Sequence, residues 1–205
     1  MNEAEFKAVL RELVDENPFA VRAALQILAL GFTGEVPTLA VTCEDRPRLL
    51  VNLSFVREHC RTQAHVKALI CHEFLHVLLR HTERRGPIAE AEHLAFDAVI
   101  NAVIHREQGP EYSSLMSRYY AEEKGLMRLL RPITKGELAA SLRIARRIPV
   151  WFGPWMGLYE GLIVADDIVE LAAGLKGRDL ATIDVGRLLG DHSDRPVRGA
   201  LAEAL

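Results

Sequence analysis

The sequence predicts an α+β protein: a small antiparallel sheet packed on a helical hairpin, followed by a mainly helical C-terminal half. Apolar residues recur at helical intervals over residues 3–30 and 63–107, whereas residues 38–52 hold two short runs with the pattern of strands. Residues 111–205 return to helical spacing, with breaks at proline and glycine. The composition, 49% apolar and 26% charged over 205 residues, is typical of a globular protein.

The N-terminal segment predicts two helices joined by a short turn. Phe6, Val9 and Leu13 repeat every three or four residues, and the same spacing resumes after a break at Asn17-Pro18. We expect residues 31–37 to form a loop.

A β-hairpin is predicted next. Residues 38–42 and 48–52 are short apolar runs rich in β-branched and leucine side chains, and the polar residues 44–47 separate them. The hairpin supplies the antiparallel sheet.

Two further helices are predicted to form a helical hairpin. The first runs from about Gln63 to Arg85 and ends at Gly86-Pro87. The second runs from Ile88 to about Glu107 and ends at Gly109-Pro110. The expected buried stripe of the first helix is Val66, Leu69, Ile70, Phe74, Val77 and Leu78.

The remaining residues predict helices with interruptions at Pro132, Pro149, Pro154 and Gly186. Residues 149–155 hold both tryptophans, and they could line a cleft or form a buried corner; we favour the buried corner. We therefore expect a core at residues 1–110 and a helical region at residues 111–205 that packs on it and could cover its cleft.

Charge and cysteine content narrow the possible functions. A net charge of −3 and a pI near 6.2 give no reason to expect nucleic-acid binding, and the basic clusters at 84–85 and 143–147 are short. No apolar run reaches transmembrane length, and the acidic, amphipathic residues 1–7 do not resemble a signal peptide. With three cysteines expected to be free thiols, we predict a cytoplasmic protein that does not associate with membranes.

The pentapeptide His72-Glu73-Phe74-Leu75-His76 lies within the first hairpin helix. Histidines at i and i+4 project from one helical face, so both imidazoles can reach a single ion. Zinc accepts such nitrogens, and a catalytic site adds a third protein ligand and a water. Glu73 is rotated about 100° from His72, the position of a general base for that water.

The second hairpin helix offers three candidate third ligands: His93, Asp97 and His105. If the hairpin folds at position 86.5, His76 mirrors onto Asp97, and the other two candidates miss by about a turn or more, at least ~5–6 Å. Asp97 is therefore the predicted ligand. His72 mirrors onto Asn101, which we expect to hydrogen-bond that histidine and orient it.

This arrangement resembles the gluzincin branch of zinc metallopeptidases. That branch carries HExxH and then Glu-x-x-x-Asp on a second helix, where this chain has Asp97-Ala98-Val99-Ile100-Asn101. A closer resemblance, over residues 36–110, is to predicted bacterial metallopeptidases associated with von Willebrand A-like domains. Their motif is HExxH, leucines, His and Arg, then an Ala-Asp-x-x-Ile-Asn helix; the matching segments here are residues 51–56, 72–84 and 96–101.

The resemblance implies a zincin-like core and zinc-dependent peptide hydrolysis. Oxyanion stabilisation would fall to His192, or to Tyr119 or Tyr120, as a histidine or tyrosine does in gluzincins. The strand at residues 49–52 would offer an edge to the substrate backbone. By family analogy, a von Willebrand A-like protein or an AAA-type ATPase would be a partner, although this chain has no Asp-x-Ser-x-Ser motif.

Other polar residues near the motif have simpler interpretations. We expect His81 to face away from the metal, His65 to lie at the helix start, and Cys71 to pack in the core. Two alternative functions stay open: an inactive or partner-specific metal-binding regulator with the same fold, and a helical interaction module whose histidines are incidental.

Overall fold

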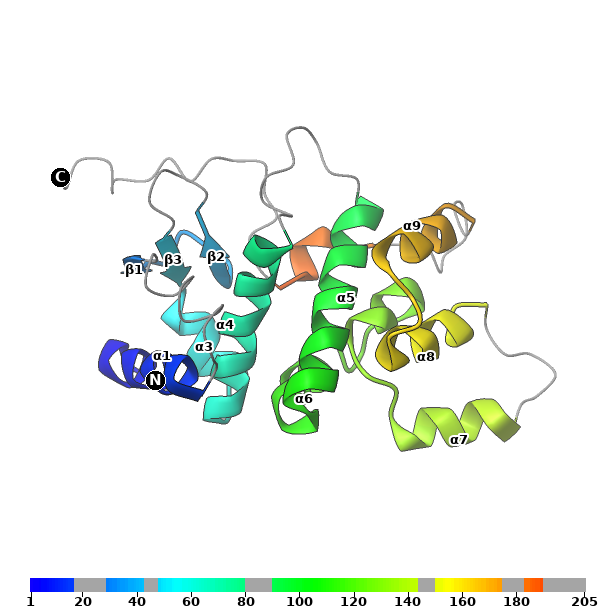
Figure 1. The fold of residues 1–205 in the computed structure, drawn as a ribbon, viewed down its shortest axis with the longest axis horizontal. Coiled ribbons are helices and arrows are strands. Elements are labelled where there is room, and N and C mark those ends of the chain that lie inside the picture. The colour runs from blue at the N-terminus through cyan, green and yellow to red at the C-terminus, as the bar shows by residue number, and fades with distance from the viewer. Residues whose placement is uncertain (17–28, 43–47, 80–89, 144–149, 175–182, 190–205) are drawn as a thin grey trace. The chain divides into compact units, whose positions relative to one another are not determined.

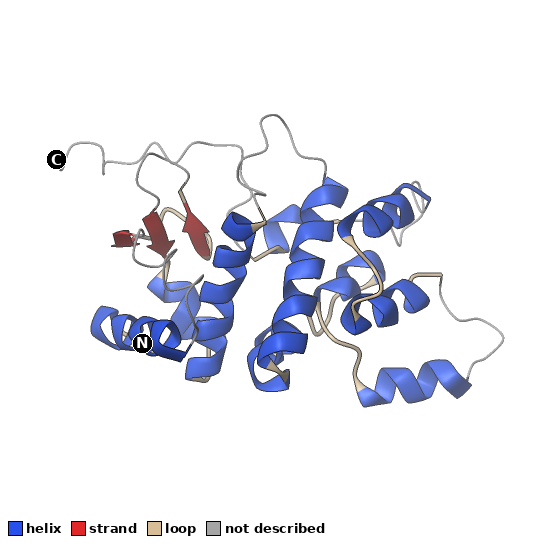
Figure 2. Cartoon of the chain, viewed as in Figure 1, coloured by secondary structure: helices blue, strands red, loops and turns tan. Residues whose placement is uncertain are grey.

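The computed structural model describes residues 1–16, 29–42, 48–79, 90–143, 150–174 and 183–189 (Figure 1). Its elements are helices and one small sheet, so the predicted α+β class is confirmed (Figure 2). The chain divides into two compact units, one of residues 1–87 with 189–205 and one of residues 88–188. The predicted functional division at residue 110 stays a prediction.

The sheet of the first unit has three strands: β1 (Ala29–Phe32), β2 (Leu39–Val41) and β3 (Arg48–Val51), in the order β1-β3-β2. β2 and β3 pair antiparallel with Ala40 opposite Leu50, which confirms the predicted hairpin strands. β1 pairs parallel to β3, so the prediction of a purely antiparallel sheet was wrong. Four apolar residues ending at Phe32 are too short a run to distinguish a strand from a helix end by pattern.

The central position of β3 corrects a second expectation. Leu49 pairs with Leu30 on one side and with Val41 on the other, so this strand has a hydrogen-bonded neighbour on each side. It therefore cannot offer an edge to a substrate. The outer strands of this sheet are β1 and β2.

Helix α1 (Glu3–Glu16) packs against α4 (Gln63–Leu78) in the same unit. Phe6, Val9 and Leu13 are buried on α1, as their spacing predicts. A buried lysine on α4, Lys67, extends its Nζ to Glu16 at 2.7 Å and to Glu12 at 3.1 Å. Apolar packing and a paired buried cation therefore hold these two helices together. Most of the second predicted N-terminal helix lies outside the described residues. Its expected end at residues 29–30 and the start of the expected loop at residues 31–32 form strand β1 instead, so both expectations were wrong there.

Helix α4 is buried on almost every side. Val66, Leu69, Ile70 and Phe74 of the predicted stripe are buried, but Leu78 is 47% exposed. The helix begins after Thr62, whose side-chain oxygen accepts a hydrogen bond from the backbone N–H of His65 at 3.3 Å. The helix ends at Leu78 with Leu79 as its C-cap, and residues 80–85 of the predicted continuation lie outside the described residues.

A short helix between sheet and motif, α3 (Leu53–His59), was not predicted. Its N-cap is Asn52, whose side-chain oxygen accepts from the backbone N–H groups of Ser54 and Phe55. The Asn52 amide also donates to the Val36 carbonyl at 2.8 Å, tying the strand end to the preceding loop. The N-cap asparagine after a strand was the signal that could have predicted this helix.

The second unit is organised around α5 (Glu90–Gln108), which contacts α6 (Pro110–Tyr119), η2 (Gly125–Leu130), α8 (Phe152–Glu160), α9 (Ala165–Gly174) and η4 (Val185–Arg187) (Figure 1). Helix α7 (Lys135–Arg143) lies between η2 and α8 in the sequence. Gly109 separates α5 from α6 with φ of +88°, a conformation that favours glycine, so the predicted break is confirmed.

Pro154 was predicted to interrupt a helix, and this prediction was wrong. It lies in the first turn of α8, where backbone N–H groups have no intrahelical acceptor and the missing proton costs nothing. Trp155 is fully buried and Trp151 is 7% exposed, which confirms the buried-corner interpretation. Among the described residues, no helix is both long and apolar enough to cross a membrane.

Candidate metal centre

The HExxH motif lies in the last two turns of α4, and its histidines meet as their spacing predicts. The Nε2 atoms of His72 and His76 are 3.0 Å apart, and their ring centroids are 4.8 Å apart. Both imidazoles are buried. One helical turn therefore presents two ring nitrogens at a single point in a water-poor environment.

The spacing of this pair fits a shared ion. Two nitrogens each about 2.05 Å from a tetrahedral zinc ion would be about 3.3 Å apart. The observed 3.0 Å is only slightly shorter, and a small ring rotation would make up the difference. The same distance also fits an N–H···N hydrogen bond between two neutral imidazoles, so the geometry permits a metal without requiring one.

Glu73 follows His72 directly and is only 5% exposed. Its position on the helix is rotated about 100° from His72, so it lies beside the histidine pair. A carboxylate in this position could accept a proton from a water close to both imidazoles.

Asp97 and Asn101 occupy successive turns of α5, and both are fully buried. The Asn101 Nδ2 donates to the carbonyl oxygen of Leu130 at 3.0 Å. The three predicted ligands, His72, His76 and Asp97, are all buried, and this group could hold a metal ion. Two imidazole nitrogens and one carboxylate oxygen are also the donor types of a catalytic zinc site.

His105 and His65 are used elsewhere. The Nδ1 of His105 lies 2.7 Å from Ser113 Oγ, and its ring packs edge-on against Tyr159. Burial is the larger cause that lowers the pKa of His105, and the nearby Arg106 charge lowers it further. His105 is therefore neutral at physiological pH. The Nδ1 of His65 accepts from the backbone N–H of Arg61 at 3.1 Å, as expected of a residue at the helix start.

Several remaining candidates stay predictions. His93 is buried one turn before Asp97 on α5. Tyr120 is fully buried, while the ring of Tyr119 lies 4.8 Å from the Arg187 guanidinium. His192, predicted to stabilise the oxyanion, lies outside the described residues, as does His81.

Cys71, next to His72, has the properties of a packing residue. Burial raises the pKa of its thiol to about 12, and the charge of Lys67 opposes this rise only in part. The thiol is therefore protonated at neutral pH. Only the deprotonated thiolate binds metals and reacts as a nucleophile.

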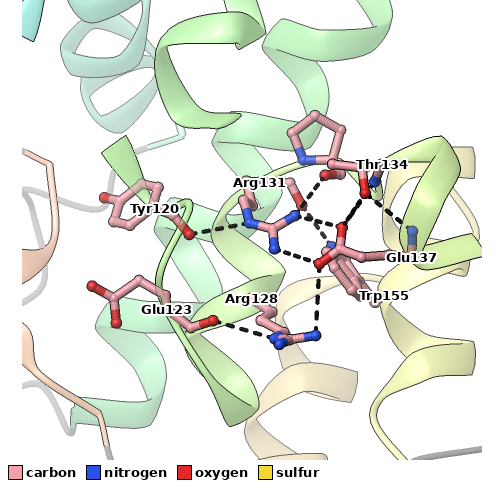
Figure 3. Close-up of polar contacts among 8 residues, drawn as sticks. Tyr120, Glu123, Arg128, Arg131, Thr134, Glu137 and Trp155 are labelled. Carbon is pink, nitrogen blue, oxygen red and sulfur yellow. Dashed lines mark hydrogen bonds and ion pairs between the residues drawn. The ribbon is translucent and has the colours of Figure 1, made fainter. Parts of the chain in front are cut away.

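A buried charged cluster in the second unit was not predicted from the sequence (Figure 3). Arg131 is 4% exposed; its guanidinium pairs with both carboxylate oxygens of Glu137 and donates to the Tyr120 carbonyl at 3.1 Å. The Arg131 hydrogen bonds, chief among the causes, lower the pKa of Glu137 to about 2. The available signal was Thr134-Lys135-Gly136-Glu137, a capping box at the start of α7.

Fold and site together define an α+β protein with a buried His-His-Asp group that could hold a metal ion. Comparison with protein-family models, curated proteins and solved structures finds no match to this chain.

Proposed function

We propose that this chain is a zinc-dependent metallopeptidase. The observation that carries the proposal is the buried pair of imidazole nitrogens 3.0 Å apart on α4, with the buried Glu73 carboxylate beside it. Each of these groups loses hydration when it is buried, and a shared metal ion would offset that cost. The sequence resemblance to HExxH metallopeptidases supports the same proposal.

The proposed ligands are His72 and His76 of α4 and Asp97 of α5. Asp97 is fully buried, and buried carboxylates in proteins are paired with cations or coordinate metals. The hairpin register of the sequence assigns this carboxylate to the level of His76. Asn101, one turn further along α5, is the proposed hydrogen-bond partner that orients His72.

Zinc at this site would supply Lewis acidity, which lowers the pKa of water and polarises a carbonyl group. Glu73 would accept a proton from the attacking water and then deliver it to the nitrogen of the leaving amine. His72 and His76 would stay neutral and bind through their Nε2 atoms. The resemblance implies a peptide or protein substrate, with His192 proposed to stabilise the oxyanion.

The resemblance also suggests the setting in which this activity operates. We propose a cytoplasmic enzyme that acts with a von Willebrand A-like protein or an AAA-type ATPase. Such a partner would restrict the substrates of a peptidase that is made among other cellular proteins.

The first test is elemental analysis of protein purified without chelators and without a histidine tag. We expect one zinc per chain in the wild type and a large loss in Asp97→Ala. Asp166→Ala is the matched control, because Asp166 is an exposed carboxylate in the first turn of α9. Zinc retained by Asp97→Ala would remove Asp97 from the site, and a wild type without metal would contradict the proposal.

The second test separates catalysis from metal binding. Glu73→Gln keeps the size of the side chain but cannot accept the proton, so it should retain zinc and lose peptide hydrolysis by at least ~10²-fold. Glu170→Gln, an exposed position on α9, is the control. A fully active Glu73→Gln enzyme would exclude the mechanism. Zinc binding without hydrolysis in the wild type would favour the regulator.

A further inference from the structure

The turn between α8 and α9, residues 161–164, presents two large aliphatic side chains to solvent. Leu162 is 74% exposed and Val164 is 60% exposed. Among the described residues, these are the two most exposed large hydrophobic side chains. Single exposed apolar residues are common on protein surfaces, but two within three residues form a local apolar patch. We name these two residues the α8–α9 knob.

The exposure of Leu162 follows from the way in which α8 ends. The Gly161 N–H donates to the Leu158 carbonyl at 3.1 Å, the Leu162 N–H donates to the Gly157 carbonyl at 2.7 Å, and Gly161 has φ of +80°. In this helix end, the residue at the position of Leu162 usually packs on the residue whose carbonyl it binds. That residue is Gly157, which has no side chain, and Ile163 Cγ1 lies 2.9 Å from the place where a Cβ would be. Leu162 is therefore left facing outward.

The turn is held at both ends. Arg106 of α5 donates from Nη1 to the Leu158 carbonyl at 3.0 Å, and its guanidinium carbon lies 3.2 Å from the place where a Cβ on Gly161 would be. At the other end, the Val164 N–H donates to Asp167 Oδ2 at 2.9 Å, just before the start of α9. An apolar patch on a turn fixed in this way loses little conformational freedom when it binds a partner.

The charge around the knob is entirely of one sign along the chain. Residues 151–174, which comprise α8, the turn and α9 (Figure 1), contain no Lys, Arg or His and four carboxylates, a formal charge of −4. All four carboxylates are exposed: Glu160, Asp166, Asp167 and Glu170. An apolar patch surrounded by negative charge favours a cationic partner and disfavours an acidic one. It also disfavours a membrane, since the anionic lipids of membranes attract basic segments.

We propose that the α8–α9 knob is a docking site for a basic amphipathic helix of a partner protein. The apolar strip of that helix would contact Leu162 and Val164, and its flanking lysines or arginines would face Glu160 and Asp166. Two aliphatic side chains cover a small area, so the complex belongs to the transient class that buries less than about 1,200 Å². The proposal goes beyond the proposed function, because no residue of the candidate metal centre takes part.

The experiment uses three labelled helical peptides of equal length as probes. The first carries a leucine strip flanked by lysines, the second the same strip flanked by glutamates, and the third the lysines with glutamine in place of leucine. Each is titrated with the full chain at about 50 mM and about 150 mM salt, and binding is followed by fluorescence anisotropy. The test variant is Leu162→Ser with Val164→Ser. Val150→Ser, an aliphatic residue 58% exposed outside the turn, is the matched control.

We expect the lysine–leucine peptide to bind the wild type, and to bind more weakly at the higher salt concentration. The double variant should bind it at least ~10-fold more weakly, because the two buried aliphatic contacts are lost, while Val150→Ser stays within about threefold of the wild type. The other two peptides should bind the wild type at least ~10-fold more weakly than the first. Both substituted positions are exposed, so the double variant should keep the melting temperature of the wild type.

Three outcomes would overturn the proposal. The first is a wild type that does not bind the lysine–leucine peptide. The second is a double variant that folds and binds this peptide as the wild type does, which would place the contact elsewhere on the chain. The third is equal binding of the lysine–glutamine or the glutamate–leucine peptide, because charge alone or apolar contact alone would then account for the association.

Discussion

Acid should weaken the second unit through one carboxyl group, Glu137. Its pKa is lowered from the ordinary value of 4.5 to about 2, chiefly by the hydrogen bonds from Arg131. A lowered pKa in the folded state means that stability is present above pH 4.5 and is lost as the pH falls toward 2.

The magnitude follows from the size of the shift. A difference of about 2.5 pKa units corresponds to about 3.4 kcal/mol, of which about 2 kcal/mol is already lost at pH 3. The Glu137 side chain is 23% exposed, so solvent screening lowers these figures somewhat and does not abolish them. Glu137→Gln should therefore reduce the unfolding free energy at pH 7 by about 2–3 kcal/mol, since it leaves the buried Arg131 charge without its partner.

The assay is urea unfolding of metal-free protein from pH 7 to pH 3, followed by tryptophan fluorescence. Trp151 and Trp155 both lie beside the Arg131 cluster, so the signal reports the second unit. The stability difference between wild type and Glu137→Gln should shrink by about 1–2 kcal/mol over this range. Glu160→Gln, at an exposed position, serves as control. A difference that does not change with pH would refute the reasoning.

Three further perturbations test other parts of the structure. Cys71 should resist alkylation at pH 8 in folded protein and react after unfolding, because its thiol pKa is about 12; mass spectrometry of labelled peptides measures this. Asn52→Ala should lower the unfolding free energy by about 1–2 kcal/mol, since it removes the cap of α3 and the bond to Val36, and urea unfolding would detect the loss. Leu13→Ala, at a fully buried position on α1, should cost about 2–5 kcal/mol in the same assay, and a cost below 1 kcal/mol would mean that α1 is not packed as described.

Sequence patterns predicted the parts of the fold that depend on local spacing. The strands at 39–41 and 48–51, the motif helix and α5 all follow from periodicity, and the 3.0 Å approach of His72 to His76 follows from their i, i+4 spacing. Mirroring positions across the hairpin turn selected Asp97 and Asn101, both of which are fully buried.

Features that depend on distant partners were not predictable in this way. The parallel pairing of β1 with β3 joins segments about 20 residues apart, and a four-residue apolar run carries no sign of it. The burial of Arg131 depends on acceptors supplied by Tyr120 and Glu137. An isolated arginine in a sequence is usually exposed, so tertiary contacts decided this case.

The double ion pair of Lys67 sets a limit on how the protein can be shortened. Glu12 and Glu16, its two partners, lie in the last turns of α1, on the side of α4 away from the histidine pair. A protein engineered to begin after α1 would expose the ammonium group of Lys67 to water. It would also expose the apolar surface that Phe6 and Leu13 cover. The first sixteen residues should therefore be kept in any shortened version made for crystallisation or assay, even though they contribute no proposed ligand.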